Sequence, residues 1–450
     1  MNKRYREKRK QKQSMTVIFL CLFVLSILIV CLIFVHAQNH DSNSNKTAGN
    51  VKTDKSNGEE IQNDEGFYMV GETQNNEEIQ NVEETQDIEN SDMTVDNDLD
   101  QRAKEILLTL SLEEKVAQLF IVLPEQLIGN VDRVTAAGDV TREAINKRPV
   151  GGIIYLSSNL ISPQQTKTMT DNVQQFSMER LNVPMFLCVD EEGGQVTRLA
   201  GKEGFNLPIF DNMSVIGSQG ITDKAREIGE SIGQYLYDLG FNTDFAPVAD
   251  VLSNPQNQVV RYRSFGADPE IVKEMANAVS HGLASQKILS AYKHFPGHGD
   301  TTEDTHHGYA YSNKTKEELY QCELIPFING IENDVPFIMV GHISFPNIVG
   351  DNTPASLSKT IVKDLLIDEL HYTGIIITDA LNMGAISQEY SSDQAAVKAL
   401  KAGVDMLLMP ADFNTAYEGV LSAVKSGEIS EERINESVYK ILKTKMTILE

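Results

Sequence analysis

One stretch of the chain concentrates residue types that transfer protons, bind sugars or hold metals. Residues 293–308 read KHFPGHGDTTEDTHHG, with four histidines, three carboxylates and a lysine. Within it, Asp304 and His306 lie two residues apart, so a tight turn can bring the carboxylate to the imidazole. The carboxylate would fix the tautomer and raise the basicity of a ring that both donates and accepts protons near neutral pH. The spacing predicts an acid/base pair, with a structural hydrogen bond in the loop as the alternative.

The histidines of this stretch are also possible zinc ligands. Zinc sites, however, usually place their ligands on rigid elements at defined spacings such as HExxH, and this stretch has no such spacing. Its GHG sequence also differs from the glycine-rich motifs that hold nucleotide phosphates. The sequence therefore predicts no metal and no cofactor.

Short apolar runs alternate with helix-like segments after about residue 99. Near-continuous apolar runs are typical of parallel strands buried on both faces. Eight such alternations predict an α/β fold, a (β/α)8 barrel of the TIM type, with an open doubly wound sheet as the alternative. The runs are 119–123, 152–156, 185–189, 243–248, 290–294, 337–340, 375–378 and 404–408. The helix-like segments include 164–180, 222–239, 269–286, 314–333, 358–370 and 390–402.

Polar residues follow the ends of these predicted strands. In a barrel, the C-terminal ends of the strands meet on the face where chemistry takes place. Asp379 directly ends the seventh run, and it could be a nucleophile opposite a separate proton-transfer group, as in retaining glycosidases. The other polar residues at or near strand ends are Asp190, Glu191, Glu192, Asp250, Arg263, Lys293, His294 and His342.

Four separated motifs resemble, in order, those of bacterial β-N-acetylglucosaminidases of glycoside hydrolase family 3. They are VDEEGGQVTR at 189–198, RSFGADP at 263–269, the loop motif at 293–306 and ITDALNM at 377–383. The resemblance covers residues 99–450. It implies a single-barrel β-N-acetylhexosaminidase that needs no metal.

The resemblance also implies a role for each matching residue. Asp379 would be the nucleophile, His306 the acid/base and Asp304 its partner. The sugar would be held by Asp190, Arg198, Arg263, Lys293 and His294.

The N-terminal residues predict a membrane anchor. Residues 1–14 are basic, and an uncharged apolar run from Met15 to Val35 follows, about long enough to span a bilayer. The excess of positive charge places the N-terminus in the cytoplasm and the rest of the chain outside. The alternative is a secretory signal cleaved near Ala37, but the apolar run is longer than is usual for such a signal. We therefore expect an uncleaved anchor.

Residues 36–98 predict a disordered acidic linker before the barrel at 99–450. They contain few large apolar residues, so they cannot bury enough surface to offset the entropy lost on ordering. The formal net charge of −25 disfavours nucleic acid as a partner. The expected partners are glycans or muropeptides that contain N-acetylglucosamine, and the membrane through the N-terminal helix.

Three other functions share some of these residues. A non-catalytic sugar-binding protein often presents exposed tryptophan, and this chain contains none. A β-glucosidase of the same family typically lacks the Asp304–His306 pattern, whereas a phosphorylase would use the same residues. We expect an exo-acting, retaining β-N-acetylhexosaminidase that releases terminal N-acetylglucosamine from peptidoglycan fragments.

Overall fold

The computed structural model describes residues 98–449, apart from residues 130, 303, 306, 307 and 309. In this part of the chain, eight parallel strands pair in the order β10-β1-β2-β3-β4-β5-β7-β9. A parallel bridge from Ile377 to Met406 closes the ring between β9 and β10. The strands are β1 (Phe120–Val122), β2 (Gly152–Ile154), β3 (Phe186–Val189), β4 (Thr243–Asp244), β5 (Leu289–Phe295), β7 (Phe337–Val340), β9 (Ile375–Thr378) and β10 (Leu407–Leu408).

The predicted (β/α)8 barrel is confirmed. Each strand overlaps one of the eight apolar runs, and its residues are almost all buried, as expected for strands covered on both faces. The first run lies beside the last, with Phe120 opposite Leu407. An open sheet would instead leave two unpaired edge strands, so the doubly wound alternative is wrong.

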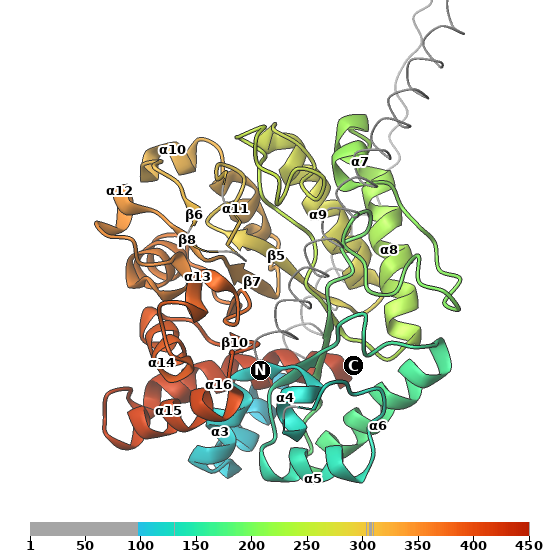
Figure 1. Ribbon diagram of the computed structural model, residues 1–450, viewed down its shortest axis with the longest axis vertical. Helices are drawn as coiled ribbons and strands as arrows, with labels where there is room; N and C mark the ends of the chain where they lie inside the picture. The colour runs from blue at the N-terminus through green and yellow to red at the C-terminus, as the bar shows by residue number, and fades with distance from the viewer. Residues whose placement is uncertain (1–97, 130, 303, 306–307, 309, 450) are drawn as a thin grey trace, which may run out of the picture. The chain divides into compact units, whose positions relative to one another are not determined.

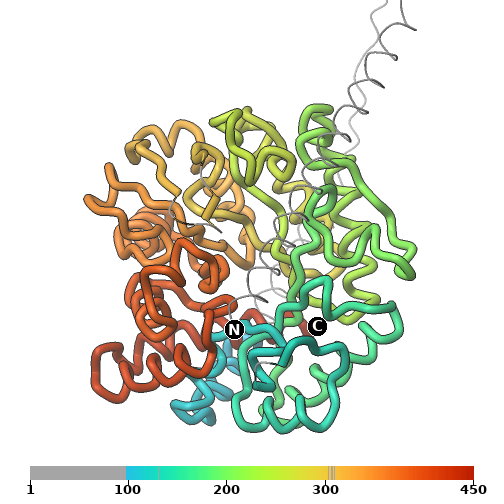
Figure 2. Tube along the Cα trace, viewed as in Figure 1, coloured from blue at the N-terminus to red at the C-terminus, as the bar shows by residue number. Residues whose placement is uncertain are grey.

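Helices cover the outside of the strands (Figure 1). Figure 2 shows the chain running once round the ring, so that the red C-terminal segments lie beside the blue N-terminal one. There, Lys115 pairs with Glu431 at 2.9 Å, and the Tyr417 hydroxyl donates to the Glu113 carbonyl at 3.1 Å. A helix over 98–109 precedes the first strand. The main outer helices are α3 (Leu112–Gln118), α5 (Asp139–Lys147), α6 (Pro163–Leu181), α8 (Thr222–Asp238), α9 (Pro269–Ser285), α11 (Leu324–Glu332), α14 (Ser392–Ala402), α15 (Phe413–Lys425) and α16 (Glu431–Met446).

Two helices differ from the sequence prediction. The segment predicted over 314–333 is broken into α10 (Lys316–Tyr320) and α11. Pro326 explains the break, because it has no N–H to donate to the residue four positions earlier and its ring clashes with that carbonyl. The segment predicted over 358–370 forms η2 (Thr360–Glu369), which has π-helical hydrogen bonds.

A buried lysine lies near the amino ends of β1 and β3. Lys445 of α16 is fully buried and donates from Nζ to Gln118 Oε1 at 2.8 Å. The same ammonium lies 5.1 Å from the centroid of the Phe186 ring. Burial lowers the pKa of Lys445 to about 7.

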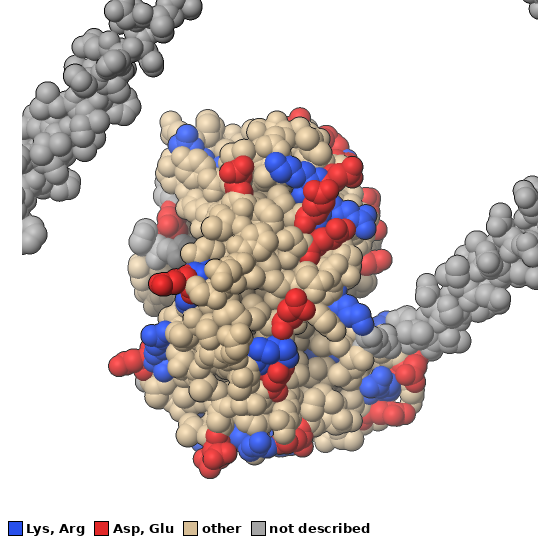
Figure 3. Space-filling view, turned by 90° about the vertical axis from the view of Figure 1, so that its right-hand side faces the viewer, with Lys and Arg blue, Asp and Glu red and all other residues tan. Residues whose placement is uncertain are grey.

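The predicted basic tail, the predicted anchor and the linker up to residue 97 lie outside the described residues. Within residues 98–449, no helix is both long and apolar enough to cross a bilayer. On the side of the barrel shown in Figure 3, acidic and basic side chains lie interspersed over a mostly neutral surface. Exposed pairs such as Arg226–Glu230 on α8, at 3.0 Å, contribute little to stability.

Candidate active site

A cavity of 350 Å³ lies at the carboxyl ends of the strands. Side chains that follow β3, β5 and β9 form much of its wall, so the barrel brings together segments far apart in the sequence. The predicted site residues that line it are Asp190, Arg198, Arg263, Lys293, His294 and Asp379. Also in the wall are Glu192, His298, Thr305 and Asn382.

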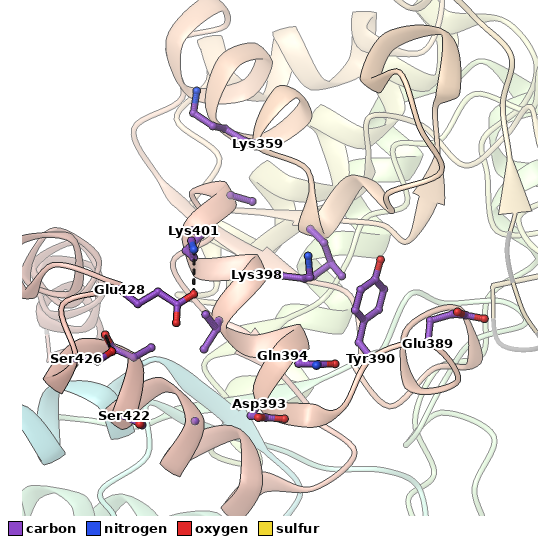
Figure 4. Close-up of a pocket in the computed structure, with 15 residues that line it drawn as sticks. Lys359, Glu389, Tyr390, Asp393, Gln394, Lys398, Lys401, Ser422, Ser426 and Glu428 are labelled. Carbon is purple, nitrogen blue, oxygen red and sulfur yellow. Dashed lines mark hydrogen bonds and ion pairs between the residues drawn. The ribbon is translucent and has the colours of Figure 1, made fainter.

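A larger hollow of 830 Å³ lies away from the strand ends (Figure 4). It is a groove between the outer helices α14 and α15, and Lys401 pairs across it with Glu428 at 3.0 Å. None of its lining residues belongs to the cavity at the strand ends. We therefore place the candidate active site in the smaller cavity.

The segment after β3 folds around Glu191. This buried carboxylate accepts hydrogen bonds from the Leu199 and Ala200 N–H groups at 3.0 and 2.8 Å, and from the Tyr235 hydroxyl at 3.0 Å. Burial raises the pKa of Glu191, although these hydrogen bonds oppose the effect. The chain thereby returns over the end of β3 and brings Arg198 to Asp190, the residue that follows the strand.

Five charged side chains meet at one wall of the cavity. Glu192 Oε1 and Oε2 accept from Arg263 Nη2 and Nε at 2.7 and 2.8 Å, and Lys293 Nζ lies 2.7 Å from Oε1. Lys293 Nζ also donates to Asp190 Oδ1 at 3.0 Å, and Arg198 Nη2 lies 3.2 Å from Asp190 Oδ2. Burial opposes ionisation of Glu192, but the two cations outweigh it and hold its pKa well below the usual range. The cluster keeps cationic donors fixed at the cavity.

Asp250 fixes the turn after β5. It is fully buried, and its Oδ1 accepts from the N–H groups of His294 and His298 at 3.1 and 2.6 Å. Its Oδ2 lies 2.7 Å from His294 Nδ1. Burial opposes ionisation of Asp250, but the two histidines lower its pKa. The carboxylate therefore holds the His294 ring by Nδ1 and sets its orientation.

Asp379 is held at the end of β9 beside basic groups. Its N–H donates to the Val340 carbonyl at 2.9 Å, and its Oδ1 accepts from the Ala380 N–H at 2.7 Å. Burial opposes ionisation, but His294 and His342 outweigh it and lower the pKa of Asp379 to about 2. The lowered pKa favours the ionised carboxylate, the form in which an aspartate acts as a nucleophile.

The loop with the predicted acid/base pair reaches the cavity. Thr305 lines it, and the Thr305 carbonyl accepts from the Ala385 N–H at 3.0 Å, at α13 (Gly384–Ser387). Asp304 is half-buried and is not among the lining residues. His306 lies outside the described residues, so the Asp304–His306 pair stays a prediction.

Several residues of the site have no role predicted from the sequence. Glu192 carried a signal, because residues two apart in an extended segment share a face and Asp190 was already a candidate. Asp250 was noted only as a strand-end carboxylate. Nothing local marked Asn382, whose place in the wall depends on the barrel closing. Within the described part of the chain, no group of three or more His, Cys, Asp or Glu side chains could hold a metal ion.

The barrel, with the Asp379 carboxylate in the wall of its strand-end cavity, has the architecture of an α/β-barrel enzyme. The family model for the N-terminal domain of glycosyl hydrolase family 3 matches residues 111–444. The chain therefore belongs to this family of glycoside hydrolases.

Similar proteins with known names support this assignment. The chain is 33% identical over 327 residues to beta-hexosaminidase A of Pseudoalteromonas piscicida, covering 67% of this chain and 54% of that protein. It is 30% identical over 340 residues to beta-hexosaminidase LpqI of Mycobacterium tuberculosis, covering 74% and 82%. The solved structure of a family 3 beta-N-acetylglucosaminidase from Paenibacillus sp. str. FPU-7 superposes with a TM-score of 0.71 at 36% identity, covering 76% of this chain and 63% of that one. The match thus spans little more than half of the first of these relatives.

Proposed function

We propose that this chain is an exo-acting, retaining β-N-acetylhexosaminidase that releases terminal β-linked N-acetylglucosamine. The observation that carries the proposal is the position of the Asp379 carboxylate, at the end of β9 in a cavity also lined by Arg198, Arg263 and Lys293. We infer the sugar from the similar proteins, which are named as beta-hexosaminidases and a beta-N-acetylglucosaminidase. The cavity volume is near the lower end for ligand pockets, which suits a single sugar ring rather than a longer segment of glycan.

The reaction would take two displacements. In the first, a carboxylate oxygen of Asp379 forms a bond to the anomeric carbon while the bond to the leaving oxygen breaks. His306 donates its proton to that oxygen, with Asp304 stabilising the imidazolium. In the second, His306 takes a proton from water, the water oxygen bonds to the anomeric carbon, and the Asp379 carboxylate leaves.

The position of Thr305 supports a role for the neighbouring histidine. Thr305 lines the cavity, and its carbonyl accepts a hydrogen bond from the Ala385 N–H of α13, so the main chain at Thr305 lies beside the proposed sugar site. The cationic cluster would donate to hydroxyl and N-acetyl oxygens, while Asp190 accepts from hydroxyls. Asp190, Arg198, Arg263, Lys293 and His294 therefore keep their proposed role as sugar-binding residues.

The first test compares two aryl glycosides. Residues 99–450 should cleave an aryl β-N-acetylglucosaminide far faster than the matching β-glucoside, because the family resemblance points to the N-acetyl sugar. His306→Ala removes the proposed proton donor. It should slow hydrolysis of a glycoside whose leaving group has a high pKa by about 10²–10⁴-fold, and hydrolysis of a glycoside with an activated leaving group much less. Product formation is measured with and without added phosphate.

Two outcomes would oppose the assignment. If His306→Ala lowers the rate of hydrolysis equally for both leaving groups, His306 is not the proton donor. A requirement for phosphate, with a sugar phosphate as product, would indicate a phosphorylase.

We further propose that residues 15–35 anchor the enzyme outside the cytoplasmic membrane, with peptidoglycan fragments as substrate. The anchor is supported by the length of the apolar run and by the basic residues before it. A location outside the membrane, together with a preference for N-acetylglucosamine, favours peptidoglycan fragments as the substrate. The full chain should sediment with membranes and be degraded by protease added to intact spheroplasts, whereas residues 99–450 should stay in the supernatant. Recovery of the full chain in the soluble cytoplasm would contradict the anchor.

A further inference from the structure

His298 is a buried histidine in the cavity wall that the proposed mechanism does not use. Its side chain is only 2% exposed, yet it lines the same cavity as Asp379 and Lys293. Its Nε2 atom is buried and has no hydrogen-bond partner among the described residues. A buried polar atom without a partner is costly, and such atoms in a native structure call for an explanation.

The backbone around His298 is held on several sides. Its N–H donates to Asp250 at 2.6 Å, and its carbonyl accepts from Asn257 Nδ2 at 2.8 Å. The next residue, Gly299, packs so closely that a Cβ atom there would lie 1.6 Å from the Val251 carbonyl oxygen. The position of the imidazole is therefore set by the fold.

The other ring nitrogen defines the tautomer. Nδ1 lies 2.9 Å from Thr301 Oγ1, and that hydroxyl also donates to the His298 carbonyl at 3.1 Å. A hydroxyl has one proton, so both contacts are satisfied when Nδ1 carries a proton and donates it to Thr301. Burial lowers the pKa of His298 to about 4, so the ring is neutral and Nε2 is a bare acceptor.

We propose that His298 is a substrate-positioning residue whose Nε2 accepts a hydrogen bond from a hydroxyl group of the sugar. The proposal rests on the proposed function and adds a residue to the site. Arg198, Arg263 and Lys293 supply only donors, and Asp190 and Glu192 already accept hydrogen bonds from them. A neutral imidazole adds an acceptor without placing another negative charge near Asp379.

The test combines two side-chain replacements with deoxy sugars. Asparagine has an amide that can take the place of Nδ1 against Thr301, whereas glutamine reaches the position of Nε2. We expect His298→Asn to raise KM for an aryl β-N-acetylglucosaminide about tenfold, the effect of one lost hydrogen bond, and His298→Gln to restore most of it. Removing one particular hydroxyl from the sugar should raise the KM of the wild type by about the same factor. The same removal should hardly change the KM of His298→Asn, which has already lost that hydrogen bond.

That coupling separates positioning from a purely structural role. If every deoxy sugar raises KM by the same factor in His298→Asn as in the wild type, the proposal is wrong. Should His298→Asn not fold, Thr301→Val provides a second measurement. This variant keeps the imidazole but removes the hydroxyl that orients it. Removing the same sugar hydroxyl should then raise KM less than it does in the wild type, and an unchanged rise would overturn the proposal. Failure of the wild type to cleave any N-acetylglucosaminide would instead overturn the proposed function, and this inference with it.

Discussion

Asp379→Asn should lower kcat for an aryl β-N-acetylglucosaminide by about 10⁴-fold or more, the scale found when a covalent nucleophile is removed. Asparagine has nearly the same shape and can still accept from the Ala380 N–H, but it cannot form the ester bond to the anomeric carbon. The steady-state rates of wild type and variant provide the measurement. With a slowly released fluorinated glycoside, mass spectrometry should place the sugar on the wild-type peptide that contains Asp379.

The pH dependence of the wild type sharpens this prediction. The pKa of Asp379 is lowered to about 2, so the active carboxylate is lost only as the pH falls through that value. An acidic limb in kcat/KM at pH 4–6 would therefore belong to another group, and Asp379 should contribute no limb there.

A matched control is Asp368→Asn, on the exposed side of η2, which should keep full activity. If Asp379→Asn retains more than about a hundredth of the wild-type rate with unchanged melting behaviour, Asp379 is not the nucleophile.

Glu192→Gln should destabilise the protein by about 3–5 kcal/mol, because it removes one partner of a buried ion cluster. Arg263 and Lys293 would lose the negative charge of the carboxylate that they share, and a neutral amide oxygen would accept from them more weakly. The free energy of unfolding is measured by denaturant titration. The KM for the sugar should also rise, because both cations belong to the proposed binding site.

The sign of the pH effect follows from the lowered pKa of Glu192. Its folded-state pKa lies below the unfolded value of about 4.3, so the stabilisation is present above that pH and is lost as the pH falls through the folded value. The difference in the free energy of unfolding between wild type and Glu192→Gln should stay constant from pH 5 to 8 and become smaller only in strong acid.

The control for this prediction is Glu270→Gln on α9. That carboxylate pairs with Lys273 at the surface, where such a pair contributes about 0–1 kcal/mol. Equal effects of the two replacements would show that the buried cluster does not stabilise the fold.

Much of the fold was predictable because its signals are local. Apolar runs of four to six residues that alternate with helix-like segments are typical of parallel strands buried on both faces. The capping box of Ser111 and Glu114 is another local signal, since residues three apart mark a helix start, and both of its hydrogen bonds are present, at 3.3 and 2.8 Å. The family motifs, such as the one ending in Asp379, are local as well, so the sequence alone determined the barrel class and the candidate carboxylates at its strand ends.

The tertiary structure decided which of these groups meet and what charge they carry. Glu192 and Arg263 are 71 residues apart, and only the closed barrel brings them to 2.7 Å. Lys445 stands in the last turn of an amphipathic helix, where a lysine is usually exposed, yet it is buried and donates to Gln118. The pKa values of Asp379, Glu192 and His298 depend on desolvation and on partners from other strands. Burial and long-range pairing arise only when the eight strands close, and a linear pattern carries no record of either.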